Sequence, residues 1–114
     1  MITITPTLRQ TILNKHNIMR NTIAKGYNHL KPAVRMATMV WNEELAKIAV
    51  FNVKQCEMKH DACRSTNSFR FAGQNLAATI WSGSTKSVAL NVNTQIRLWF
   101  DEYKLCSMSD IKSY

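Results

Sequence analysis

Apolar residues recur every three to four positions near the start of the chain, which is the spacing of one face of an α-helix. This spacing predicts a helix from Thr7 to about Lys25, and Gly26 is a fitting residue to end it. The apolar stripe consists of Leu8, Ile12, His16, Met19 and Ile23. Because His16 lies within this stripe, we expect a core histidine satisfied by hydrogen bonds rather than a ligand.

A second helix is predicted after Asn42, which is a fitting N-cap residue. Glu43 and Glu44 fall in its first turn, where the helix dipole favours acidic side chains. The positions that continue at helical spacing are Leu45, Ile48, Ala49, Asn52, Val53 and Cys56. The second helix therefore extends to about Cys56.

A third helix is predicted near the end of the chain, with Ser84 or Ser87 as its cap. Its apolar stripe consists of Val88, Val92, Ile96, Trp99 and Tyr103. Glu102 lies about 40 degrees from the leading edge of this stripe at 100 degrees per residue, so its side chain can reach a cleft. Asp101 points to the opposite side.

The segments between these helices lack helical spacing. Residues 26–41 are predicted to form a loop followed by a short extended segment, and residues 59–73 to form a polar loop. Gly73 to Ile80 is predicted to form a strand, with a turn after it. Helices combined with strands indicate an α+β protein.

The length and the charge limit the classes of protein that need to be considered. With 114 residues, the chain has room for one domain with a modest core. The net charge is +8, and no acidic residue precedes Glu43. The six basic residues before it are Arg9, Lys15, Arg20, Lys25, Lys31 and Arg35. They are widely spaced without interleaved aromatic residues, so a solvated basic face is favoured over a surface for nucleic acid or anionic membrane.

The sequence contains no signal that we interpret as a membrane or export segment. No stretch approaches the roughly 18 consecutive apolar residues that a membrane span needs. The first fifteen residues lack a charged start, an apolar core and a small-residue cleavage site, so we expect no signal peptide in this chain.

The most specific pattern lies in the middle of the chain. Cys56 is followed by His60-Asp-Ala-Cys63-Arg and then by Gly73-Gln-Asn, and the third helix carries Trp99-Phe-Asp-Glu-Tyr. This order resembles the CAP superfamily, which comprises cysteine-rich secretory proteins, antigen 5 and pathogenesis-related proteins. The resemblance is strongest to the antigen 5 branch of insects, the venom allergen-like proteins, and it covers residues 8 to about 103.

The resemblance implies a fold. It implies an α-β-α sandwich, present here in part as the N-terminal helices and the first strands, with the C-terminal strands missing. We therefore expect residues 1–7 to be a disordered or non-native leader, residues 8–106 to be a partial CAP domain, and residues 107–114 to be a tail. In the family the His-Asn-x-x-Arg motif that matches His16, Asn17 and Arg20 is structural.

The resemblance also implies a cleft lined by two histidines and two acidic residues. His60 matches the first histidine and Glu102 the second acid, while Gln74 stands where many members have glutamate. The second histidine belongs to a downstream Gly-His-Tyr-Thr-Gln motif that this sequence does not contain. Some members bind zinc in this cleft, but zinc needs three or four good donors. His60 and Glu102 are therefore only weak metal candidates, and no cofactor is expected.

The chain has three cysteines, an odd number, which leaves their pairing open. In antigen 5 proteins the cysteines that match Cys56 and Cys63 pair with cysteines in an N-terminal extension, so both are disulfide candidates. A rival hypothesis is a small zinc site of Cys56, His60, Cys63 and Cys106, whose spacing is not that of the common zinc knuckles. Nucleophilic catalysis by Cys63 has little support, because no histidine–asparagine order with an oxyanion donor is evident.

The interpretation that we favour is a secreted, extracellular, non-enzymatic protein of the antigen 5 type. It would bind a protein partner or a small apolar ligand, and some relatives bind sterols or fatty acids. One alternative is a metal-assisted hydrolase that uses His60 and Glu102. The other alternative is a small basic module that binds nucleic acid or membrane. The wide spacing of the basic residues disfavours nucleic acid as its partner.

Overall fold

The structure is a computed structural model that describes residues 3–84 and 87–112. These residues form α1 (Pro6–Ala24), α2 (Glu43–Lys54), α3 (Val88–Asp101), the 3-10 helix η1 (Glu102–Leu105) and α4 (Met108–Lys112). The chain divides into two compact units. We call Met1–Val40 with Ser84–Tyr114 the helical unit and Trp41–Gly83 the α2 unit, and each is described by itself.

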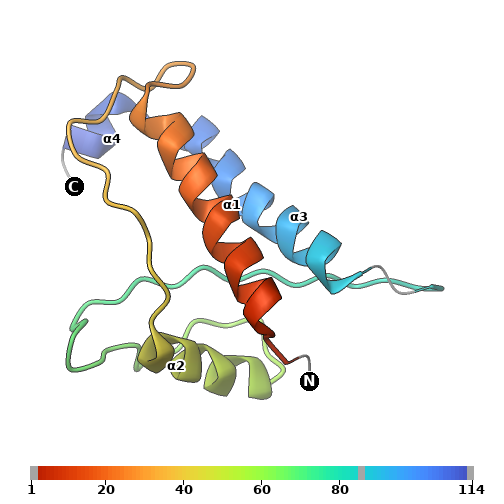
Figure 1. Ribbon diagram of the computed structural model, residues 1–114. Coiled ribbons are helices and arrows are strands. Elements are labelled where there is room, and N and C mark those ends of the chain that lie inside the picture. Colours follow the sequence, from red (N-terminus) through yellow and green to blue (C-terminus); the bar gives the residue numbers. More distant parts are fainter. Residues whose placement is uncertain (1–2, 85–86, 113–114) are drawn as a thin grey trace. The chain divides into compact units, whose positions relative to one another are not determined.

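The helical unit is built on α1 and α3, which lie side by side and run in the same direction (Figure 1). Thr5 caps α1 by accepting a hydrogen bond from the Leu8 amide at 3.2 Å, and Pro6 occupies the first turn. The helix therefore begins slightly before the predicted Thr7, because proline is favoured where the amide has no helical partner. The buried apolar side chains of this unit are Leu8, Met19, Leu30 and Ile96.

The hydrogen bond expected of His16 is observed, and Asn17 and Arg20 make hydrogen bonds as well. His16 is half-buried, and its Nδ1 lies 2.9 Å from the Ile12 carbonyl oxygen. Asn17 donates to the Met39 carbonyl at 3.1 Å and accepts from the Met39 amide at 2.8 Å. Arg20 donates from Nε and from one terminal nitrogen to the Ala37 carbonyl at 2.9 and 2.7 Å. These bonds fasten the extended segment after the first loop to α1.

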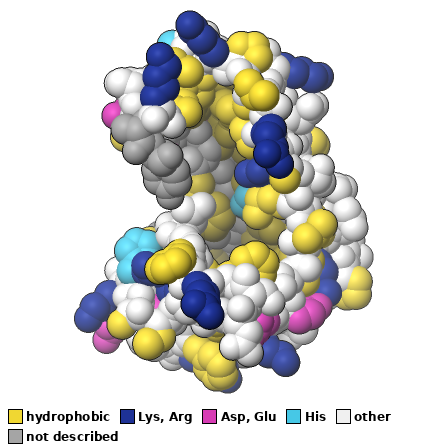
Figure 2. All heavy atoms as spheres, turned by 90° about the vertical axis from the view of Figure 1, so that its left-hand side faces the viewer, with side chains coloured by type: hydrophobic (Ala, Val, Ile, Leu, Met, Phe, Trp, Pro, Cys, Tyr) yellow, Lys and Arg dark blue, Asp and Glu magenta, His cyan; other side chains and the backbone are white. Residues whose placement is uncertain are grey.

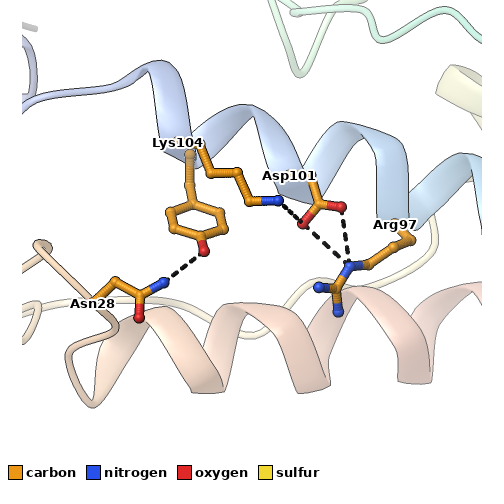
Figure 3. Close-up of polar contacts among 5 residues, drawn as sticks. Asn28, Arg97, Asp101 and Lys104 are labelled. Atoms are coloured by element: carbon orange, nitrogen blue, oxygen red, sulfur yellow. Dashed lines mark hydrogen bonds and ion pairs between the residues drawn. The ribbon is translucent and has the colours of Figure 1, made fainter.

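The first loop returns along the end of α3. Gly26 has a φ of +88°, which favours glycine, and the Ala33 amide donates to the Ala24 carbonyl at 3.1 Å. Asn28 donates from Nδ2 to the Tyr103 hydroxyl at 2.6 Å, as Figure 3 shows. Tyr27 packs against Tyr103 with ring centroids 5.2 Å apart. The loop is therefore held by an aromatic cluster at the end of α3.

The third helix is capped by Ser87, whose hydroxyl accepts a hydrogen bond from the Leu90 amide at 3.2 Å. Ser87 was one of the two predicted caps, so that prediction is confirmed. Asp101 accepts a hydrogen bond from Arg97 at 3.2 Å, and its carboxylate lies 3.5 Å from the Lys104 ammonium (Figure 3). Glu102 follows at the start of η1 and is exposed.

The described residues contain no β-strand, so the strand predicted for Gly73 to Ile80 is not observed. The reason is that a strand needs a hydrogen-bonded neighbour, and within residues 3–84 and 87–112 no second strand pairs with this segment. The extended segment predicted before Trp41 lacks a neighbouring strand in the same way. The α-β-α sandwich stays a prediction, and the domain boundaries at residues 7 and 106 stay predictions as well.

Large apolar side chains are exposed in both units. Val34 and Phe71 are each 99% exposed, and Ile80 is 96% exposed. On the face drawn in Figure 2, hydrophobic side chains are distributed among lysines and arginines. None of the helices in the described part of the chain has the length and hydropathy that a membrane span requires.

Candidate functional site

The α2 unit holds the central motif, and its geometry starts from α2 itself. Asn42 caps the helix by accepting a hydrogen bond from the Leu45 amide at 2.9 Å, as the sequence predicts. The helix ends at Lys54, close to the predicted Cys56. Cys56 has a φ of +55°, an uncommon conformation for a residue other than glycine. This conformation turns the chain sharply out of α2 and into the polar loop.

Asn52 connects α2 to that loop and is 6% exposed. Its Nδ2 donates to the Lys59 carbonyl at 2.9 Å and to the Asp61 carboxylate at 2.8 Å. Gln55, one turn further along, donates to the same carboxylate oxygen at 3.1 Å. Asp61 is therefore fixed against the C-terminal end of α2 by two amide side chains.

Gln74 makes the corresponding contacts from the other end of the loop. Its Nε2 donates to the second Asp61 carboxylate oxygen at 2.9 Å. Its Oε1 accepts a hydrogen bond from the Asp61 amide at 3.1 Å and lies 2.9 Å from Nδ1 of His60. The sequence places His60 and Gln74 fourteen residues apart, and the structure brings their side chains into contact.

The charged groups of the loop strengthen this arrangement. The pKa of Asp61 is held below its usual value first by the hydrogen bond from Asn52 and then by those from Gln74 and Gln55. The positive charge of Arg64 lowers this pKa further. Arg64 also donates to the carbonyl oxygens of Asp61 at 2.9 Å and Ala72 at 3.3 Å. The carboxylate is consequently ionised at neutral pH and acts as the centre of the loop.

A hollow of about 500 Å³ lies between α2 and the start of the loop. Ile48 and Phe51 contribute its apolar side from α2. The remaining lining residues follow α2 in the sequence and include polar groups: Gln55, Glu57, Lys59, His60, Asp61, Ala62 and Cys63. Phe51 is 65% exposed, so much of this large apolar residue is open to solvent. Five of its nine lining residues are polar or charged, so the hollow has an apolar side and a polar side.

The three predicted cleft residues are divided between the two units. His60 and Gln74 belong to the α2 unit, whereas Glu102 belongs to the helical unit. The shared cleft of His60 and Glu102 therefore stays a prediction. Among the residues that the structure describes, no three histidine, cysteine, aspartate or glutamate side chains are grouped as a metal site requires. The zinc site of Cys56, His60, Cys63 and Cys106 stays a hypothesis, because Cys106 belongs to the helical unit and the other three residues belong to the α2 unit.

Cys56, Cys63 and Cys106 are free thiols in the structure, and the first two are exposed. The disulfides of Cys56 and Cys63 with cysteines outside this sequence stay predictions.

Sequence reasoning did not identify Asn52 and Asp61 as site residues. Asn52 is one of the positions that continue at helical spacing in the second helix, and a polar residue at such a position must find hydrogen-bond partners when it is buried. That requirement is the signal that could have found it. Asp61 was recognised only as part of the His-Asp-x-Cys-Arg motif, although its carboxylate accepts three side-chain hydrogen bonds.

Comparisons with known proteins agree with the central motif. The model of the cysteine-rich secretory protein family, CAP, matches residues 13–110. The chain is 43% identical over 107 residues to "Venom allergen-1" of Aedes aegypti, covering 94% of this chain and 42% of the relative. It is 43% identical to "Antigen 5 like allergen Cul n 1" of Culicoides nubeculosus, covering 93% of this chain and 48% of the relative.

A third relative is "Venom allergen 3" of Solenopsis invicta, 41% identical over 84% of this chain and 42% of the relative. The chain thus spans less than half the length of these three curated relatives. No solved structure matches the chain significantly. The match to the family model and the identities of 41–43% together show that this chain belongs to the cysteine-rich secretory protein family.

Proposed function

We propose that this chain is part of a secreted, non-enzymatic protein of the antigen 5 type, which acts by binding a small apolar ligand. The observation that carries the proposal is the hollow beside His60. Its volume of about 500 Å³ is within the range of small-molecule pockets. Ile48 and Phe51 supply apolar contacts, and the neighbouring loop supplies a few polar groups that can orient a ligand.

Binding is favoured over metal-assisted hydrolysis by the donors that surround His60. Its Nδ1 lies 2.9 Å from the amide oxygen of Gln74. An amide oxygen is a poor zinc ligand, whereas a catalytic zinc site uses three protein ligands and a water. A calorimetric titration with zinc tests this choice in the present chain and in a full-length relative. We expect no heat of binding at micromolar zinc, and a saturable signal abolished by His60→Gln would favour the hydrolase.

The binding proposal is tested with an uncharged fluorescent probe, N-phenyl-1-naphthylamine, titrated into the whole chain. We expect saturable binding that Phe51→Ala weakens about tenfold, or about 1.4 kcal/mol, which is roughly half of the free energy of fully burying a phenylalanine. Val53→Ala is the matched control, because Val53 is 64% exposed on the same helix but does not line the hollow. Equal weakening by both substitutions, or no saturable binding, would contradict the proposal.

A further inference from the structure

The orientation of the Gln74 amide group is fixed by two partners whose roles are unambiguous. The Asp61 backbone amide can only donate, so the atom 3.1 Å from it must be the side-chain oxygen of Gln74. The ionised Asp61 carboxylate can only accept, so the atom 2.9 Å from its Oδ2 must be the side-chain nitrogen. Both contacts require the same orientation, and a flipped amide would lose both hydrogen bonds.

This orientation determines which nitrogen of His60 carries the proton. The atom 2.9 Å from Nδ1 is the Gln74 oxygen, which is an acceptor, so Nδ1 must donate. In a neutral imidazole the other nitrogen then carries the lone pair. His60 is exposed and lines the hollow, and no described residue engages Nε2. The ring therefore offers a hydrogen-bond acceptor at Nε2, on a side chain that lines the hollow.

We infer that Gln74 is a positioning residue that holds His60 as the Nδ1–H tautomer, so that the hollow selects apolar ligands that carry a hydrogen-bond donor such as a hydroxyl group. The ligand part of this inference rests on the proposed binding function. The tautomer part rests only on the hydrogen bonds within the α2 unit. A ligand with an ether oxygen alone would face the Nε2 lone pair with another lone pair and would gain no hydrogen bond.

Glutamine suits this role better than glutamate. A carboxylate at position 74 would still accept from Nδ1 of His60, but it would place a negative charge about where the amide nitrogen lies, 2.9 Å from the Asp61 carboxylate. Two like charges at that distance repel each other. The amide satisfies both neighbours at once, because it donates to Asp61 and accepts from His60.

The tautomer is measured by long-range proton–nitrogen correlation spectra of the chain with labelled histidine, at an alkaline pH of about 8.5. The spectrum of His60→Gln identifies the His60 signals. We expect the protonated nitrogen to be Nδ1 in the wild-type chain. Predominant protonation of Nε2 would overturn the inference, whatever the ligand experiments give.

Two glutamine-to-methionine substitutions separate the role of Gln74 from a general effect on Asp61. Both Gln55 and Gln74 donate to the Asp61 carboxylate, but only Gln74 contacts His60. Gln74→Met should move the tautomer ratio about fivefold towards Nε2–H, which corresponds to one lost hydrogen bond, whereas Gln55→Met should not. Gln74→Glu keeps the acceptor and should keep the Nδ1–H tautomer. An unchanged ratio in Gln74→Met would overturn the positioning role.

Ligand selection is tested with decan-1-ol and 1-methoxydecane, which share an oxygen acceptor but of which only the alcohol has a donor. We expect the wild-type chain to bind the alcohol about fivefold more tightly and Gln74→Met to lose most of that preference. Equal binding of the two would overturn the inference while leaving the proposed function intact. Binding of neither would overturn both, and the spectra would still report the tautomer separately.

Discussion

The buried side chain of Asn52 provides the most direct test of how the α2 unit is held together. Replacing it by alanine removes two hydrogen bonds, to the Lys59 carbonyl at 2.9 Å and to the Asp61 carboxylate at 2.8 Å. A hydrogen bond contributes about 1 kcal/mol net, so the substitution should cost about 2 kcal/mol. Because Asn52 is only 6% exposed, water cannot easily enter the space that the Asn52 amide group leaves and take over its hydrogen bonds.

Hydrogen exchange at the Asp61 amide reports this loss locally, because that amide is bonded to the Gln74 oxygen at 3.1 Å within the same network. A loss of about 2 kcal/mol corresponds to exchange about thirty times faster when opening is at equilibrium. Asn67→Ala makes the same chemical change at an exposed position of the loop and should alter exchange little. Equal exchange rates in Asn52→Ala and the wild-type chain would refute the assignment of Asn52 as the anchor of the loop.

Three further predictions concern pH, the core and the first loop. Because the folded pKa of Asp61 is lowered, its contribution to stability is present above the ordinary aspartate pKa of about 4 and is lost as the pH falls through the folded pKa. The difference in the free energy of unfolding between the wild-type chain and Asp61→Asn, measured in urea, should therefore shrink on acidification, and a pH-independent difference would contradict this. Ile96 is 3% exposed between α1 and α3, so Ile96→Ala should cost about 2–5 kcal/mol in urea unfolding. Leu98 is 58% exposed, and a similar cost for Leu98→Ala would argue against a core centred on Ile96. Gly26→Ala should cost about 1–2 kcal/mol in thermal or urea unfolding, because φ is +88° and the added methyl group would lie 3.1 Å from Pro32. At Gly73 no atom lies within 4 Å of such a methyl group, so Gly73→Ala should be tolerated without such a loss.

The helices could be predicted from the sequence because their signals are local. The cap at Asn42, the acidic first turn of α2 and the stripe that includes Ile96 each depend on residues within a few positions of one another. The start of α1 differed from the prediction because Thr5 and Pro6 provide a better cap than Thr7. Local spacing could not decide whether Gly73–Ile80 forms a strand, because a strand depends on hydrogen bonds to a neighbouring strand.

The site could be predicted only in part. The motif located His60 and Gln74, but their hydrogen bond depends on how fourteen residues of irregular loop close, and no periodicity encodes that closure. The roles of Asn52 and Asp61 likewise follow from contacts across the loop. The position of Glu102 relative to His60 depends on how the two units are arranged, so their convergence remains a prediction of the family resemblance.

We expect the hollow between α2 and the start of the loop to take a small apolar ligand. The most direct measurement is a titration of the isotopically labelled chain with decan-1-ol, followed in amide and methyl correlation spectra. We predict saturable shifts concentrated at residues that line the hollow, including Ile48, Phe51 and Ala62, with little change in α1 and α3. Saturable shifts concentrated in α1 and α3, or no saturable shifts at all, would contradict it.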